Sequence, residues 1–274
     1  MGKLQAESIA FVGGGTMGGA IIAGLLARGL IPPDRITVSD VRGERVAQLC
    51  EQHGVLGTTD NSKAVARAGI VVLAVKPQVL PQVLAGLKGR IPSRALVLSI
   101  VAGASIDYLA EGLGHPALVR AMPNTPAQVG EGMAVWMATE AVSPSQREQA
   151  RGILRALGEE VCVTEERYLD MATALSGSGP AYVLLFLEAL IDGGVYMGLS
   201  RPIAERLAWQ TMWGTLALVR ERGDHPAVLR NQVTSPGGTT AEALQCLERG
   251  GLRALVTEAI WAAFQKAQKL GKKR

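Results

Sequence analysis

Short runs of aliphatic residues alternate with helical patterns along the first half of the chain. An apolar run at residues 9–12, a helical pattern at 17–28 and a second run at 35–39 together have the length of a strand, helix and strand unit. Further runs with strand character lie at 70–75, 96–100, 117–120, 133–136 and 160–164. Because several runs are apolar throughout, they are typical of strands that are buried on both faces of a sheet. The pattern predicts an α/β domain with a doubly wound, mainly parallel sheet.

The pattern of the chain changes near residue 165. Runs with strand character stop there, and long helical patterns follow at 180–197, 201–222, 240–248 and 252–270. The second half is therefore predicted to be all-α. The change predicts two domains, residues 1–165 and residues 166–274.

Composition and charge exclude several classes of protein. The chain has 274 residues, of which 48% are hydrophobic and 19% charged, so it can bury a core and is not a disordered chain. The net charge is only +4, and part of it comes from a basic end without aromatic residues for stacking on bases. We expect a frayed, solvated terminus and no nucleic-acid partner. The basic residues of this end are Lys269, Lys272, Lys273 and Arg274.

The sequence has no pattern that indicates a metal, a disulfide or a membrane. The three cysteines are far apart and odd in number, and no histidine lies at ligand spacing from another histidine or from a cysteine. The N-terminus has no secretory signal pattern, and Glu188 and Asp192 interrupt the most apolar stretch. We expect a soluble, cytoplasmic protein with no metal ion and no membrane contact.

A glycine-rich loop follows the first apolar run directly. Gly13, Gly15 and Gly18 fit the pattern G-x-G-x-x-G between a predicted strand and a predicted helix. In this pattern the first glycine permits a tight turn, the second lets a pyrophosphate approach the backbone, and the third lets the helix pack on the strand. The loop predicts a dinucleotide site, and a structural turn without a ligand is the alternative.

The residues after the second strand give conflicting indications about the nicotinamide cofactor. Asp40 lies where an acidic residue binds the ribose 2′-OH of NAD, whereas Arg42 and Arg45 could bind the 2′-phosphate of NADP. The arginines could also be solvated residues at the start of a helix. Lys76 and Pro77 end another strand at the edge where ligands bind in doubly wound folds, which favours a cofactor contact over a strand terminator.

Two segments of small residues lie in the helical half, at 176–180 and 234–240, each immediately before a helix. In the second segment, hydroxyl groups and the amides at the helix start could bind a small carboxylate, and a simple helix N-cap is the alternative. Neither segment contains His, Lys, Cys, Asp or Glu. We therefore expect chemistry that needs little proton abstraction, such as hydride transfer to a protonated carbon–nitrogen double bond.

These residues resemble the pyrroline-5-carboxylate reductase family over essentially the whole chain. The most specific part of the resemblance is residues 233–240 with their continuation through 243–248. Gln232 departs from the family, whose members often have Asn there. The other segments that resemble the family are residues 12–18, 74–77, 122–126, 175–182, 192–195 and 197–199.

The resemblance implies a Rossmann-type N-terminal domain and an all-α C-terminal domain that dimerises, with dimers in some members forming larger rings. It implies hydride transfer from NADPH, or from NADH, to the C=N bond of 1-pyrroline-5-carboxylate, which gives L-proline. It also implies that the substrate contacts Glu166, Ser235, Gly237, Gly238, Thr239 and Thr240, with the hydroxyl of Thr240 as the catalytic donor to the ring nitrogen. The cofactor would contact Val12, Gly13, Gly14, Gly15, Thr16, Met17, Gly18, Ser39, Asp40, Arg42, Asn61, Ala74, Val75, Lys76, Pro77, Ile100, Val101 and Ala102.

Two other functions remain as alternatives from the sequence. β-Hydroxyacid dehydrogenases share a glycine loop and a helical domain, but they use a lysine on the first long helix of that domain, and residues 180–188 contain no lysine. A non-catalytic, NADP-binding redox sensor would have no use for the hydroxyl groups and paired glycines of 235–240. Arg42 and Arg45 favour NADPH over NADH.

Overall fold

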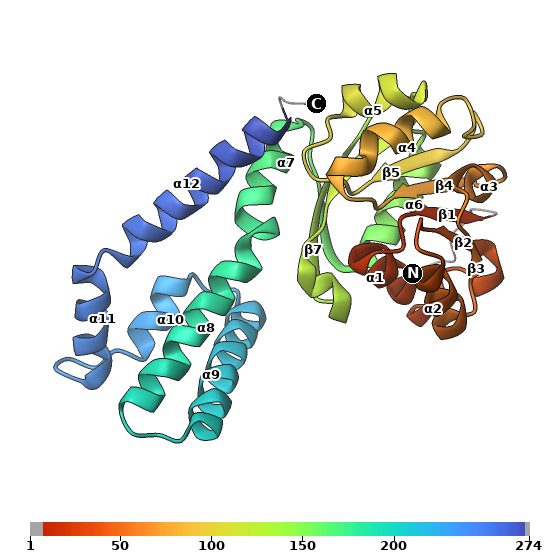
Figure 1. Cartoon of the computed structure of the whole chain (residues 1–274). Coiled ribbons are helices and arrows are strands. Elements are labelled where there is room, and N and C mark those ends of the chain that lie inside the picture. The colour runs from red at the N-terminus through yellow and green to blue at the C-terminus, as the bar shows by residue number, and fades with distance from the viewer. Residues whose placement is uncertain (1–7, 272–274) are drawn as a thin grey trace. The chain divides into compact units, whose positions relative to one another are not determined.

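The computed structural model describes residues 8–271. Its first part is built on an eight-stranded sheet with the strand order β3-β2-β1-β4-β5-β6-β7-β8 (Figure 1). All neighbouring strands are parallel except β6 and β7, which are antiparallel. The prediction of a doubly wound, mainly parallel sheet is confirmed. The strands are β1 Ile9–Val12, β2 Ile36–Ser39, β3 Leu56–Thr58, β4 Ile70–Leu73, β5 Leu96–Ser99, β6 Leu118–Met122, β7 Gly132–Ala138 and β8 Gly158–Cys162.

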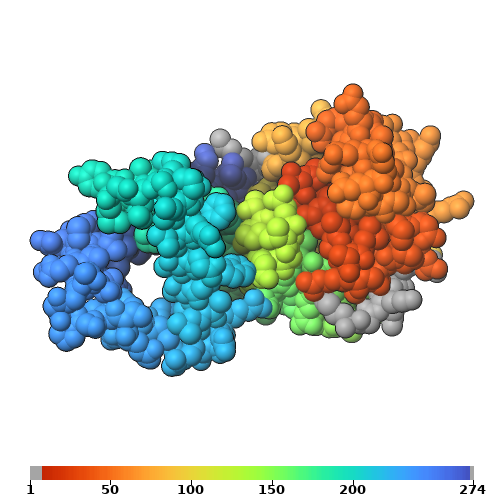
Figure 2. Space-filling view, turned by 90° about the horizontal axis from the view of Figure 1, so that it is seen from below, coloured from red at the N-terminus to blue at the C-terminus, as the bar shows by residue number. Residues whose placement is uncertain are grey.

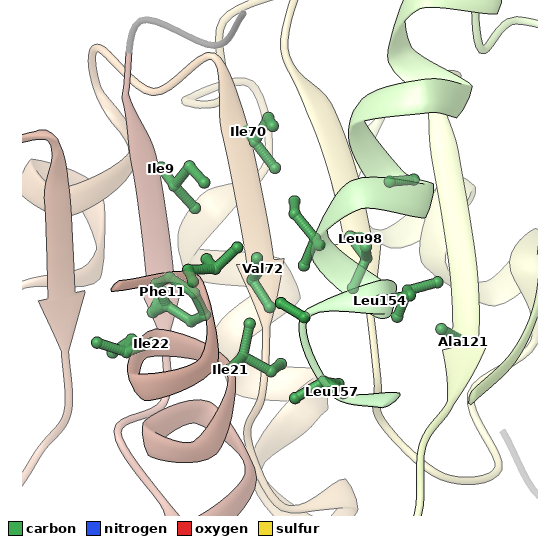
Figure 3. Packing of buried hydrophobic residues seen from close by; sticks show 14 of the residues in the cluster. Ile9, Phe11, Ile21, Ile22, Ile70, Val72, Leu98, Ala121, Leu154 and Leu157 are labelled. Carbon is green, nitrogen blue, oxygen red and sulfur yellow. The ribbon is translucent and has the colours of Figure 1, made fainter. Parts of the chain in front are cut away.

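Helices cover both faces of this sheet, which explains why several of its strands are buried throughout. Side chains alternate along β1, so Ile9 and Phe11 pack on one face and Ala10 and Val12 on the other. Figure 3 shows Ile9 and Phe11 in the first of these layers, together with Ile21 of the first helix. That layer includes α1 Thr16–Ala27, α2 Gly43–His53 and α6 Pro144–Arg155, and the opposite layer includes α3 Asn61–Val65, α4 Leu80–Leu87 and α5 Ile106–Leu113.

The predicted helical patterns of the second half correspond to long helices. The pattern at 201–222 coincides with α9. Each of the other three patterns differs from its helix by no more than one residue at either end. A continuous helix covers Arg167–Tyr196 and includes a π-helical turn, Thr173–Gly177. The helices are α7 Arg167–Ala172, α8 Gly179–Tyr196, α9 Arg201–Arg222, α10 Pro226–Gln232, α11 Thr239–Arg249 and α12 Leu252–Gly271.

The chain divides into two compact units, the described parts of 1–178 with 263–274, and residues 179–262. This division differs from the predicted boundary at residue 165 because α7 and the π-helical turn are bound to the sheet. Asp170 is paired with Arg120 of β6, and the amide group of Asn124 donates to the carbonyl of Ser176. We call residues 179–262 the helical unit. The expectation for Lys272, Lys273 and Arg274 lies outside the described residues.

The helical unit has a small core of its own and many exposed apolar side chains. Ile191, Ala204 and Ala208 are buried in it. Figure 2 shows a gap between turquoise and darker blue parts of this unit. Among the described residues, the continuous helix Arg167–Tyr196 is long and apolar enough to cross a membrane by length and composition alone. Large exposed apolar residues of the helical unit include Leu184, Leu185, Leu207, Trp209, Trp213, Leu216, Leu255 and Trp261.

Candidate functional site

The glycine loop forms a tight turn between β1 and α1. Gly13 has a φ of +106°, and a Cβ atom at this position would lie 2.6 Å from the carbonyl oxygen of Ala74, so another residue would strain the turn. The amide of Gly13 donates to the carbonyl of Ser39 over 2.8 Å, and the amide of Ala74 donates to that of Val12. The first glycine of the motif therefore lets the loop pass closely between two neighbouring strands.

The other two glycines of the motif differ in their surroundings. A Cβ atom on Gly18 would collide with the carbonyl of Gly13, so this glycine permits close packing of α1 on the turn. A Cβ atom on Gly15 would have nothing within 4 Å, and among the residues that the structure describes no side chain makes a capping hydrogen bond at the N-terminus of α1. The first turn of α1 therefore presents amide groups on an open side of the loop, which fits a pyrophosphate.

Asp40 helps to hold this loop in place. Its carboxylate accepts hydrogen bonds from the amides of Gly14 and Arg42, both at 3.0 Å, and is paired with the Arg42 guanidinium at 3.1 Å. Burial raises the pKa of this carboxyl, but the hydrogen bonds from Arg42 and Gly14 outweigh burial and hold the pKa below its ordinary value. Asp40 is thus ionised at neutral pH, and its carboxylate is already hydrogen-bonded to the loop.

A basic cavity of about 650 Å³ lies beside the glycine loop. The Nε of Arg45 donates to the carbonyl of Gly14 at 2.6 Å, while Arg42 projects from the protein with 64% of its side chain exposed. The basic side chains of Arg42, Arg45 and Lys76 line this cavity next to helix-terminal amides. This arrangement fits the phosphates of a dinucleotide, including a 2′-phosphate. The lining residues are Gly15, Thr16, Gly19, Ala20, Ala23, Arg42, Arg45, Gln48, Leu49, Gln52, His53, Lys76 and Gln128.

The remaining predicted cofactor residues lie at the same edge of the sheet. The Ser39 hydroxyl is buried at the end of β2 and donates to the side-chain oxygen of Asn61 at 2.8 Å. Residues 74–77 follow β4 directly, and residues 100–102 follow β5. Since β1, β2, β4 and β5 are parallel, their carboxyl ends meet at one edge. The structure therefore brings the predicted cofactor residues together.

The loop at 235–240 has the geometry expected for an anion site. Gly237 has a φ of +67°, and Gly238 is the N-cap of α11 without a hydrogen bond from a capping side chain. The alternative in which Ser235 or a threonine is a simple N-cap therefore has no support among the described residues. Thr239 and Thr240 occupy the first turn of α11, with their amides at the positive end of the helix dipole.

The other small-residue segment differs from the loop at 235–240. Residues 173–177 form a π-helical turn inside a continuous helix, closed by a hydrogen bond from the amide of Ser178 to the carbonyl of Thr173 at 2.8 Å. A Cβ atom on Gly177 would lie 2.9 Å from the side chain of Met122. This segment therefore lies largely inside a continuous helix and not before one, contrary to the prediction from the sequence.

Glu166 lies at the start of α7, in the unit that contains the sheet, whereas the loop at 235–240 belongs to the helical unit. Its carboxylate is paired with the Arg120 guanidinium at 2.6 Å and accepts the backbone amide of Ile106 at 2.8 Å. The predicted substrate residues are therefore divided between the two units.

Comparisons with known protein families match the two parts of the chain separately. Residues 166–270 match the family model for pyrroline-5-carboxylate reductase dimerisation. Residues 8–103 match the model for NADP oxidoreductase, coenzyme F420-dependent. The chain is 45% identical over 265 residues to pyrroline-5-carboxylate reductase of Synechocystis sp., which covers 97% of this chain and 98% of that protein. The chain belongs to the pyrroline-5-carboxylate reductase family.

Solved structures of pyrroline-5-carboxylate reductases have the same fold over the whole chain. The enzyme of Coxiella burnetii matches with a TM-score of 0.90 and 39% identity, over 96% of this chain and 98% of that one. The Plasmodium falciparum enzyme, whose structure was solved with NADP bound, matches with a TM-score of 0.88 and 32% identity, over 98% of this chain and 100% of that one. The predicted family is confirmed.

Two charged residues that belong to the ion cluster around Glu166 were not identified from the sequence. Arg120 is buried in the middle of β6, and Asp170 of α7 is paired with it at 3.3 Å. The signal that could have found them is an arginine inside an otherwise apolar strand, since a buried guanidinium needs carboxylate partners.

Proposed function

We propose that the chain reduces the C=N bond of 1-pyrroline-5-carboxylate with NAD(P)H and so forms L-proline. The observation that carries this proposal is the similarity to reductases of this name along 97% of the chain, which includes the cofactor residues and the loop at 235–240. In terms of domains, residues 1–165 would bind the dinucleotide, and residues 166–274 would bind the substrate and form the dimer.

The glycine loop and the basic cavity are the cofactor site in this proposal. When bound, the reduced nicotinamide supplies the hydride. The amides at the start of α1 bind the pyrophosphate, and the exposed Arg42 guanidinium binds the 2′-phosphate, which favours NADPH over NADH. Asp40 is bound to Gly14 and Arg42, so it is not free to accept a ribose hydroxyl without giving up these contacts.

The loop at 235–240 binds the substrate in this proposal. The amides of the loop and the Ser235 hydroxyl bind the carboxylate, and the Thr240 hydroxyl donates to the electron pair that forms on the ring nitrogen as hydride adds. Hydride adds to the ring carbon, and the electron pair of the C=N bond moves onto the nitrogen, so a protonated imine becomes a neutral amine without a general base. Orientation of the two reactants can lower the barrier by roughly 7–11 kcal/mol, which is why a strong acid is not required.

A second copy of the chain is the proposed partner of the helical unit. The exposed apolar residues on α8, α9 and α12 would be covered by the same surface of the other subunit, which the match of 166–270 to a dimerisation family supports. Covering by protein also accounts for the apolar character of Arg167–Tyr196 in a soluble, cytoplasmic enzyme. Dimers would further assemble into a ring in this proposal.

Loss of reduced-cofactor absorbance on addition of pyrroline-5-carboxylate tests the proposed reaction. The assay is run with NADPH and with NADH, and a hydroxy acid with oxidised cofactor is the control for dehydrogenase chemistry. Oxidation that depends on the imine, faster with NADPH, is the expected result. A protein that binds the dinucleotide but does not turn over the imine would contradict the substrate assignment.

Thr240 provides a test of the proposed catalytic group. Thr240→Ala should lower kcat by about 10- to 100-fold because a single positioned hydrogen-bond donor is lost, whereas Thr240→Ser keeps the hydroxyl and should stay within a few-fold of the parent. Steady-state kinetics at saturating cofactor measure both variants. If Thr240→Ala keeps the parent kcat, the hydroxyl does not assist the reaction.

A further inference from the structure

Arg120 is a buried cation that the proposed reaction does not use directly. Only 8% of its side chain is exposed, and it lies in β6, next to β5 in the sheet. One nitrogen of its guanidinium is paired with Glu166 at 2.6 Å and another with Asp170 at 3.3 Å. A buried guanidinium with two carboxylate partners holds both of their side chains in fixed positions.

Of the two carboxylates, Glu166 makes a further contact with the first residue of α5. Its Oε1, which is paired with Arg120, also accepts the backbone amide of Ile106 at 2.8 Å. Ile106 is the first residue of α5, so the carboxylate binds a helix-terminal amide, a favourable place for negative charge. Arg120 thus fixes the start of α5 through one intermediate side chain.

The segment that ends at this helix start is the β5–α5 loop, residues 100–105. It contains Ile100, Val101 and Ala102, which are predicted cofactor contacts, and Gly103, whose φ is +72°. At its beginning the amide of Val101 donates to the Ser99 hydroxyl at 3.3 Å. The Glu166 carboxylate holds the other end of the loop.

We propose that Arg120 is a positioning residue, which holds the β5–α5 loop in the cofactor site through the Glu166 carboxylate. The inference rests on the proposed function for the identity of the ligand at this loop. The link itself, from Arg120 to Glu166 to the Ile106 amide, is independent of the substrate. It predicts that loss of Arg120 loosens the loop and lowers turnover, although Arg120 is not one of the predicted cofactor or substrate residues.

Asp170 provides a matched control within the same cluster. It is paired with Arg120 as Glu166 is, and its side chain is 21% exposed against 31% for Glu166. Among the described residues, however, the contact of its carboxylate is with Arg120 and not with the loop. Glu166→Gln and Asp170→Asn each remove one charge and keep the shape of the side chain. A comparison of the two variants therefore separates the effect of losing the contact with the loop from the effect of losing one charge in the ion cluster.

Hydrogen exchange of the intact protein, without substrate, is the primary measurement. Arg120→Met and Glu166→Gln should each raise the exchange rate of the amides at 100–106 about tenfold, since a charge-assisted hydrogen bond is lost. Both should lower kcat about tenfold, with a smaller change in the cofactor KM. Arg120→Lys keeps a cation and should recover part of both effects, and Asp170→Asn should stay within about twofold of the parent.

The double variant Arg120→Met/Glu166→Gln completes the test. Both substitutions break the same link. The double variant should therefore have the exchange rate and the kcat of the more affected single variant, and not the product of the two single effects. Multiplicative effects, or equal effects of Asp170→Asn and Glu166→Gln, would overturn the proposal. A lower kcat of Glu166→Gln with parent-like exchange would overturn it too, since Glu166 would then act on the substrate and not on the loop. A parent protein inactive on the imine would refute the proposed function and leave the exchange result intact.

Discussion

Two arginines beside the glycine loop make different contacts, and these contacts separate their roles. Arg42 is exposed and is paired with Asp40, so its guanidinium can turn towards a ligand at little cost to the loop. Arg45 is half-buried and donates to the carbonyl of Gly14. Arg45 therefore supports the loop that both NADPH and NADH would use, whereas Arg42 has its charge available for a 2′-phosphate.

This difference predicts that substitution of Arg42 affects the KM for NADPH alone, whereas substitution of Arg45 affects the KM for both cofactors. Arg42→Gln should raise the KM for NADPH about tenfold and leave the KM for NADH within about twofold, since one charge-assisted contact with the 2′-phosphate is lost. Arg45→Gln should raise the KM for both. Steady-state kinetics with each cofactor measure the four values. An equal loss for both cofactors in Arg42→Gln would place the 2′-phosphate elsewhere.

Asp40 predicts a pH dependence of stability. Its pKa in the folded protein lies below the ordinary value of 3.8, so its ionised form stabilises the fold above that pH, and the stabilisation is lost as the pH falls through the lower, folded pKa. Asp40→Asn should therefore lower the Tm at pH 7 by roughly 2–4 °C for about 1 kcal/mol. The difference from the parent should shrink below about pH 4 in thermal melts over a pH series. A gap that is constant with pH would show that the charge is not responsible.

Among the elements, the long helices and the buried strands are those that the sequence predicts best. The predicted helix at 201–222 coincides with α9, and the run at 9–12 coincides with β1. Among the elements for which the sequence predicts no range are two short ones, β3 and α10. β3 has three residues with Gly57 in the middle, and α10 has seven residues, so neither is long enough to show a period.

The candidate site is predictable where it depends on local motifs and not where it depends on distant contacts. The glycine loop and the start of α11 are motifs within a few residues of sequence, and both have the predicted form. The pairing of Arg120 with Glu166 joins residues 46 positions apart, and only the packing of α7 on the sheet brings them together. The hydrogen bond from the side-chain amide of Asn124 to the carbonyl of Ser176 likewise joins the π-helical turn to a distant part of the chain.

The turn between β1 and α1 predicts a contrast between two glycine substitutions. Gly13→Ala should destabilise the fold, because φ is positive and the added Cβ meets the Ala74 carbonyl. Gly15→Ala should keep the Tm of the parent, since its Cβ has open space, yet it should weaken dinucleotide binding at least tenfold by blocking the approach of the pyrophosphate. Thermal melts and a fluorescence titration with NADPH measure both properties. Parent-like affinity in Gly15→Ala would show that the pyrophosphate does not approach this backbone.

At the scale of the whole molecule, the helical unit cannot bury its apolar residues within one chain. Its buried core is small, while Trp209 and Trp213 of α9 and Leu255 of α12 are each more than half exposed. Large exposed apolar surfaces of this kind mark interaction sites in soluble proteins. The stability of this unit should accordingly depend on protein concentration, as for an obligate dimer.

Trp213 offers the sharpest test of that dimer. Its side chain is 64% exposed in the single chain, and burial of a tryptophan at the centre of an interface often contributes more than 2 kcal/mol. Trp213→Asp would place a charge there, so light scattering should show a monomer at concentrations where the parent is dimeric. Leu56→Asp is the matched control, because Leu56 is 54% exposed on the edge strand β3 and belongs to the other unit. The control should remain a dimer; if Trp213→Asp does so as well, a different face of the helical unit joins the subunits.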